Sequence, residues 1–151
     1  MKQYNALPSI IVSLIIVIAF VGFVDASYLT VKKYFGSPLT CYFFSGCDEV
    51  SSSPYSYIYG IPLSLFGTFF YLGVILSSVW YLQIRGALQA KLLFFLTTVG
   101  FIFSIYTFSL QAFVIKAFCF YCVVSFVCSV LNFLLLSYGW KRYVSIPAPA
   151  L

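Results

Sequence analysis

The last long apolar stretch of the chain, FCFYCVVSFVCSVLNFLLLSYGW (residues 118–140), contains no charged residue and begins with the motif Cys119-Phe-Tyr-Cys122. Its length is close to the roughly 20 residues that a helix needs to cross a bilayer. Cysteines three positions apart on a helix lie on one face, so their side chains can meet. A helix N-terminus also favours the thiolate form of cysteine. The stretch therefore predicts a membrane helix with a disulfide-forming or reactive pair at its start.

The composition extends the membrane prediction to the whole chain. Of its 151 residues, 63% are hydrophobic and 7% are charged, whereas a soluble domain carries about 25% charged residues. With so few charges, the net charge of +5 is interpreted as a sign of membrane orientation, and no nucleic-acid partner is expected. Because there is no histidine and there are only three acidic residues, we expect no metal site and no histidine-based catalysis.

Four apolar runs predict four membrane spans, at about residues 8–31, 62–82, 89–110 and 118–140. The first run is too long for the apolar region of a typical signal peptide, so we expect it to be retained as a span. Asp25 is expected near the outer interface, since a carboxylate at mid-bilayer is costly. Short turns between the later spans predict one all-α domain over residues 1–151, an integral-membrane four-helix bundle.

The first connection, residues 32–61, is the one long loop, and it carries Cys41 and Cys47. Loops of this length in small proteins are often functional. Its later part, Tyr55-Ser-Tyr-Ile-Tyr59, is typical of a membrane interface or of a short half-embedded helix. Five basic residues on the side of the termini against three on the other favour cytoplasmic termini and an extracytoplasmic loop.

The parity of four spans brings four of the five cysteines to one side of the membrane. The first and third connections lie on the same side whichever way the chain inserts, so Cys41, Cys47, Cys119 and Cys122 face one compartment. If that compartment is outside the cell, disulfides persist there. Cys128 lies six residues beyond Cys122, deeper in the span, and is expected to be a small buried side chain.

Three arrangements are open for the four cysteines. A zinc site is disfavoured because Cys41 and Cys47 are six residues apart rather than in a tight hook. Static disulfides would account for the even number. A redox relay also accounts for the placement of one pair in a loop and the other beside the bilayer. Thiol–disulfide exchange needs direct contact of sulfurs, and a mobile loop pair above a fixed helix pair allows it.

Aromatic side chains near the second pair offer a place for a flat, lipid-soluble acceptor such as a quinone. Phe126 lies four residues beyond Cys122, on the same face and one turn deeper, where it could wall a quinone ring or simply pack in the bundle. Tyr57, Tyr59 and Phe66 are further candidates for such a wall because of their position in the sequence.

A set of motifs spread along the chain carries a family resemblance. In order, they are Asp25-Ala-Ser-Tyr28-Leu-Thr, Cys41-x5-Cys47-Asp-Glu-Val, Ser53-Pro-Tyr, Gly60-Ile-Pro-Leu-Ser-Leu-Phe-Gly67 and Cys119-x-x-Cys122. Together they resemble the bacterial form of the vitamin K epoxide reductase family over about residues 8–140. The other quinone-linked thiol oxidase family, the disulfide-bond protein B type, has its C-x-x-C in the first outer loop, so the reversed order here argues against it.

The resemblance implies a four-helix bundle around a quinone, of the ubiquinone or the menaquinone (vitamin K) type. It implies that Cys119 and Cys122 form the active-site pair and that the Cys122 thiolate faces and reduces the quinone. Cys47 would shuttle electrons to Cys119, and Cys41 would exchange with a redox partner.

Two further residues match positions of the family beside the quinone. Ser53 matches its loop serine by its place before Pro-Tyr. Phe126 matches the aromatic residue four positions after the second active-site cysteine. Tyrosine is common there, so phenylalanine removes a hydroxyl from the implied pocket.

The resemblance also implies a partner and a location. Many bacterial members carry a fused thioredoxin-like domain, and this sequence stops at Leu151, so a separate thioredoxin-fold partner, such as a periplasmic thiol oxidase, is expected. The expected activity is thiol–quinone oxidoreduction in support of disulfide bond formation. The expected site faces the periplasmic side of the inner membrane. The alternatives are reduction of vitamin K epoxide or quinone in a vitamin K cycle, and a non-enzymatic bundle with structural disulfides.

Overall fold

The computed structural model of the protein describes residues 6–36 and 46–144. The elements follow in the order α1 (Ser9–Tyr34), α2 (Cys47–Ser52), a 3₁₀ turn (Pro54–Ser56), β1 (Tyr57–Ile58), β2 (Ile61–Pro62), α3 (Leu63–Ile84), α4 (Ala87–Ser109) and α5 (Phe120–Gly139). Turns of π-helix extend α4 over Leu110–Ile115 and α5 over Trp140–Val144.

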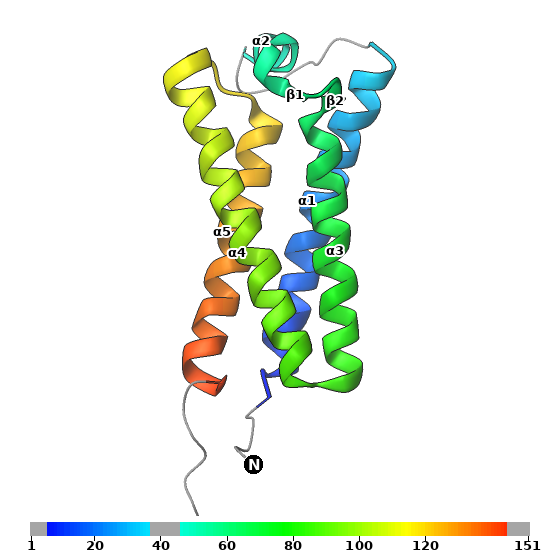
Figure 1. Cartoon of the computed structure of the whole chain (residues 1–151), viewed down its shortest axis with the longest axis vertical. Coiled ribbons are helices and arrows are strands. Elements are labelled where there is room, and N and C mark those ends of the chain that lie inside the picture. The colour runs from blue at the N-terminus through cyan, green and yellow to red at the C-terminus, as the bar shows by residue number, and fades with distance from the viewer. Residues whose placement is uncertain (1–5, 37–45, 145–151) are drawn as a thin grey trace, which may run out of the picture.

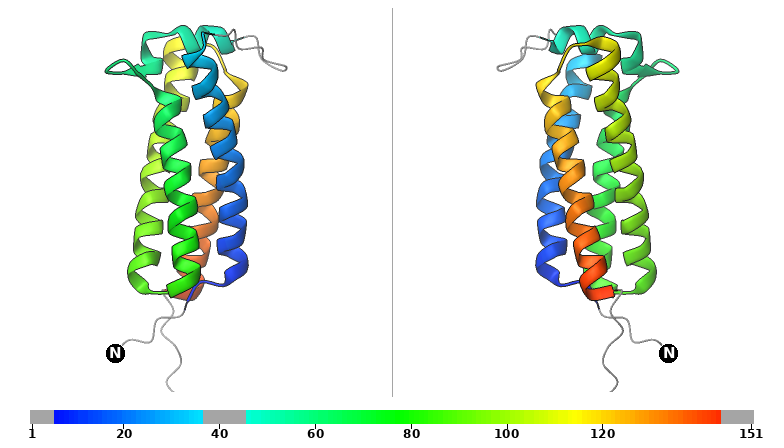
Figure 2. Two further views of the ribbon diagram at one scale, coloured as in Figure 1. Left: turned by 90° about the vertical axis from the view of Figure 1, so that its right-hand side faces the viewer. Right: turned by 90° about the vertical axis from the view of Figure 1, so that its left-hand side faces the viewer.

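The helices α1, α3, α4 and α5 are long and apolar enough to cross a membrane. They lie side by side as an elongated bundle (Figures 1 and 2). The predicted all-α membrane bundle is therefore confirmed. The predicted ranges 8–31, 62–82, 89–110 and 118–140 overlap these four helices, and α1 continues to Tyr34.

The core of the bundle is built on α1, which packs against both α3 and α5. Its buried residues recur every three or four positions, and many of them are small: Ile11, Val12, Ile15, Ala19, Gly22, Ala26 and Thr30. Small residues at such positions let membrane helices approach closely. Large apolar residues such as Ile10, Val17 and Phe20 point outward, as expected for a surface that faces lipid.

One end of the bundle carries all of the described loop structure. The helix α1 begins and α5 ends at one end, whereas α2, the two strands and the start of α5 lie at the other (Figure 1). The first and third connections are thus on the same side, as the parity of four spans predicts. Here α2 lies over the ends of the long helices as a cap (Figures 1 and 2), and Cys47 is its first residue.

A short hairpin follows α2. The strands β1 and β2 pair antiparallel through Tyr57 with Pro62 and Ile58 with Ile61. The two turn residues, Tyr59 and Gly60, have positive φ angles of 50° and 80°, which is the geometry of a tight two-residue hairpin turn. This turn directs the chain from the cap into α3.

Deeper in the bundle, a tyrosine ring fills the space left by a glycine. A Cβ atom at Gly22 of α1 would overlap the ring of Tyr71 of α3, and Tyr71 is 1% exposed. The Tyr71 hydroxyl donates a hydrogen bond to the Ser125 backbone oxygen at 2.7 Å. The absence of a side chain at residue 22 thus lets Tyr71 reach from α3 to α5.

We predict that Gly22→Ala lowers the thermal unfolding midpoint in detergent. The added methyl group would force the Tyr71 ring aside, and overpacking of this kind costs about 1–3 kcal/mol. Gly73→Ala is the matched control, because its Cβ would lie 3.4 Å from Leu96 Cδ2, an ordinary contact. An equal or higher midpoint for Gly22→Ala than for Gly73→Ala would contradict this packing.

Candidate active site

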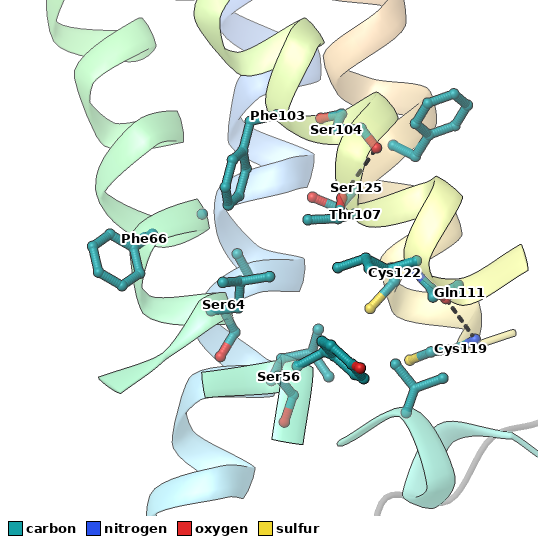
Figure 3. Close-up of a pocket in the computed structure, with 18 of the residues that line it drawn as sticks. Ser56, Ser64, Phe66, Phe103, Ser104, Thr107, Gln111, Cys119, Cys122 and Ser125 are labelled. Carbon is teal, nitrogen blue, oxygen red and sulfur yellow. Dashed lines mark hydrogen bonds between the residues drawn. The ribbon is translucent and has the colours of Figure 1, made fainter. Parts of the chain in front are cut away.

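A cavity of about 480 Å³ lies between the four long helices at the capped end of the bundle. This volume is within the roughly 300–1,000 Å³ of small-molecule sites. Most of its wall is apolar and includes the rings of Phe66, Phe70, Phe103 and Phe126. Cys119 and Cys122 both line it, and their sulfurs lie near its upper end, below α2 (Figure 3).

Cys119 is held in place by its backbone. It is the N-cap of α5, with extended φ and ψ angles of −95° and 125°, and its carbonyl accepts the first helical bond from Val123 at 3.1 Å. Its own N–H donates to Oε1 of Gln111 at 3.1 Å. Gln111 is 4% exposed and lies in the π-helical turn after α4, so this bond fixes the start of α5 against the end of α4 (Figure 3).

The surroundings of Cys119 lower the pKa of its thiol to about 7. The largest cause is a hydrogen bond from the Cys122 thiol, and the backbone N–H groups of Cys122 and Tyr121 and the charge of Lys33 act in the same direction. Burial opposes them. The neutral thiol makes no side-chain capping bond, so the N–H groups act by favouring the thiolate at the positive end of α5.

Cys122 and two residues after it form one wall of the cavity. Cys122, Ser125 and Phe126 line it together, because positions three and four apart share a helix face. Phe126 is fixed by stacking on Phe108 of α4, with ring centroids 4.6 Å apart and an interplanar angle of 21°. This arrangement holds a flat aromatic surface one turn below the Cys122 sulfur.

Cys47 packs against the active-site pair from above. It is 1% exposed and belongs to a buried cluster with Val50, Ala117 and Cys119. Cys47 is disulfide-bonded, whereas Cys119 and Cys122 are free thiols. The predicted partner, Cys41, lies outside the described residues.

A glycine allows this close packing. A Cβ at Gly46 would lie 3.0 Å from the Ala117 Cβ and 3.0 Å from the Phe118 backbone oxygen. The backbone oxygen cannot move cheaply, so only glycine lets the start of α2 rest against the segment that leads into Cys119.

The sequence model of the vitamin K epoxide reductase family matches residues 13–137, which is most of the chain. The chain belongs to the vitamin K epoxide reductase family. Members are oxidoreductases of the membrane, and four long apolar helices agree with a multi-pass membrane protein. In a comparison with curated proteins, none matches the chain.

The structure brings most of the predicted site residues of this family member to the cavity. Cys119, Cys122, Ser53, Phe66 and Phe126 all line it. Cys47 lies beside Cys119 in the buried cluster above it.

Tyr57 and Tyr59, predicted as cavity residues, do not lie at the cavity. Successive residues of an extended strand point to opposite faces, and Ile58 between them is the residue that lines it. Tyr59 is in the hairpin turn and is 101% exposed. The Tyr57 ring instead lies 4.1 Å from the Lys33 Nζ, which also donates to the Ser56 backbone oxygen at 3.1 Å. These contacts hold the hairpin against α1.

Several polar residues of the site were missed from the sequence. Asp25, expected near the outer interface, lines the cavity wall, because nine further residues of α1 follow it and extend the helix by about 14 Å. Lys33, Ser64 and Gln111 also line the cavity. The spacing of Asp25, Leu29 and Lys33, four residues apart on one helix face, was the available signal for the first two.

We predict that Cys122→Ala raises the pKa of Cys119, because it removes the hydrogen bond that contributes most to the lowered value. At pH 7 the thiolate fraction of Cys119, and hence its alkylation rate by iodoacetamide, should fall several-fold. The measurement is the pH dependence of alkylation of reduced protein, with Cys119 followed by mass spectrometry. Cys128→Ala should leave the midpoint near 7. An unchanged midpoint in Cys122→Ala would refute this explanation.

Proposed function

We propose that the protein is a thiol–quinone oxidoreductase that passes electrons from a thioredoxin-fold partner to a quinone in support of disulfide bond formation. The observation that carries the proposal is a C-x-x-C pair that opens into an apolar cavity between membrane-spanning helices, with Cys47 packed directly above it. The cavity is open to a lipid-soluble acceptor, and the cap carrying Cys47 is on the side where a protein partner can reach it.

The cavity residues fit a quinone. Four phenylalanine rings supply an apolar wall for a flat ring system. The hydroxyls of Ser53 and Ser64 line the same cavity, are buried, and have no hydrogen-bond partner within the described structure. Buried polar groups are rarely left unpaired, so these hydroxyls support a ligand with hydrogen-bond acceptors such as the two quinone carbonyls.

Electrons would enter through the loop pair. A thiolate of the partner attacks the Cys41–Cys47 disulfide, and a second partner thiol resolves the mixed disulfide, which leaves the loop pair reduced. The Cys47 thiolate then attacks the Cys119 sulfur of the inner disulfide, and Cys41 resolves this second mixed disulfide. The loop pair is oxidised again, and the inner pair becomes a dithiol.

The inner dithiol would then reduce the quinone by two electrons and become a disulfide. The Cys122 sulfur adjoins the ring site above Phe126, whereas Cys119 holds the thiolate that closes the disulfide, since its pKa is lowered to about 7. This assignment corrects the expectation that the thiolate is on Cys122. The Cys122 thiol instead donates a hydrogen bond to Cys119.

We predict that Cys122→Ser abolishes quinone reduction. The purified protein in detergent is supplied with a dithiol donor and a quinone, and formation of the hydroquinone is followed by absorbance. Cys128→Ser is the matched control, because Cys128 is also on α5 but does not line the cavity, and it should retain the activity. Normal reduction by Cys122→Ser would end the proposed mechanism.

A second variant tests the step between the two pairs. Gly46→Ala should slow electron transfer from the loop pair at least tenfold, because the added methyl group pushes Cys47 away from the Cys119 segment. Quinone reduction by protein whose inner pair has been reduced beforehand should stay at the wild-type rate. Thiol trapping after rapid mixing measures the first step and absorbance the second. If both rates stay at wild-type values, the close packing at Gly46 has no role in the relay.

A further inference from the structure

Quinone reduction raises a question of proton supply, and the inference here rests on the proposed function. Conversion of a quinone to a hydroquinone takes two electrons and two protons. The inner pair supplies both electrons when its disulfide forms. Because the Cys119 thiol has a pKa of about 7, a large part of the reduced pair at neutral pH holds only the Cys122 proton. A second proton must then come from another group at the cavity.

Asp25 is placed to supply it. Among the described residues that line the cavity, Asp25 carries the only carboxyl group. Its Oδ2 atom is buried and has no hydrogen-bond partner within the described structure. An unpaired carboxylate in apolar surroundings is unfavourable, and a nearby thiolate adds repulsion. This geometry favours a protonated carboxyl when the cysteine pair is reduced.

The other titratable groups around Asp25 do not fit the task. Cys119, Cys122 and Cys128 face it from the side of α5, and Tyr71 faces it from α3. The Tyr71 hydroxyl already donates its proton to the Ser125 oxygen. The α4 residues that line the cavity carry no titratable group.

The remaining charged residues are also placed elsewhere. Lys33, two turns further along α1, is bonded to the hairpin. The carboxyl groups of Asp48 and Glu49 are on the exposed side of α2 and do not line the cavity.

We propose that the carboxyl group of Asp25 donates the second proton to the quinone as the inner disulfide forms. In the balanced step, the Cys119 thiolate and the Cys122 thiol form the S–S bond and release two electrons and the Cys122 proton. One quinone oxygen receives that proton and the other receives the proton of Asp25. Asp25 is left as a carboxylate and takes up a proton from water before the next turnover.

The test is Asp25→Asn, which keeps the size and polarity of the side chain but has no proton to donate. Hydroquinone formation by pre-reduced protein should slow about 10²-fold, in the range of lost general acid catalysis. The wild-type rate should rise with pH as Cys119 ionises and fall again as Asp25 does, whereas the variant should lack the falling limb. Asp25→Glu should restore part of the rate, and Glu49→Gln on α2 is the matched control that should match the wild type.

Two further measurements separate the possible failures. Alkylation of Cys119 and exchange with the dithiol donor should remain in Asp25→Asn, which shows that the variant is folded and that only the proton step is affected. Wild-type rate and pH profile in Asp25→Asn would overturn the role of Asp25 while the oxidoreductase activity stands. No quinone reduction by the wild-type protein would instead overturn the proposed function itself.

Discussion

The hydrogen bond from the Cys119 backbone N–H to the Gln111 side chain is the contact on which the site depends. It joins the π-helical turn after α4 to the first residue of the C-x-x-C motif. The end of one membrane helix is thereby tied to the start of the next, and the N–H groups of the first turn of α5 are aimed at one sulfur. Loss of this bond would leave a buried N–H unpaired, which costs about 1–3 kcal/mol, at the point where the thiolate must be held.

Around this point the bundle combines two kinds of packing. Small residues on α1 let α3 and α5 come close in the lower part, whereas the upper part leaves a cavity with aromatic walls. Polar atoms in that cavity are few, and those of Asp25, Ser53 and Ser64 are buried without partners. A membrane protein can keep such atoms at modest cost only if a ligand or water pairs with them, and this links the architecture to the chemistry proposed for the site.

Much of the fold could be predicted from the sequence, because apolar runs of bilayer length have few alternatives. The C-x-x-C pair, Phe126 and Ser53 were predicted as site residues because their spacing or motif fixes their place, and each lines the cavity. Tyr57 and Tyr59 could not be placed, since their orientation depends on the register of a hairpin only two residues long on each strand. Gln111 and Asp25 were missed because their roles depend on contacts between helices, which no local pattern encodes.

The pairing of Gly22 with Tyr71 also sets the depth of the cavity. Tyr71 is the deepest residue of α3 that lines it, and its ring lies where a side chain at residue 22 would be. The floor of the cavity is thus made by two helices together, and it limits how far a ring system can descend below Cys122. A relative with a smaller residue at position 71 would have a deeper chamber and room for a larger head group, so this pair acts as a size filter for the acceptor.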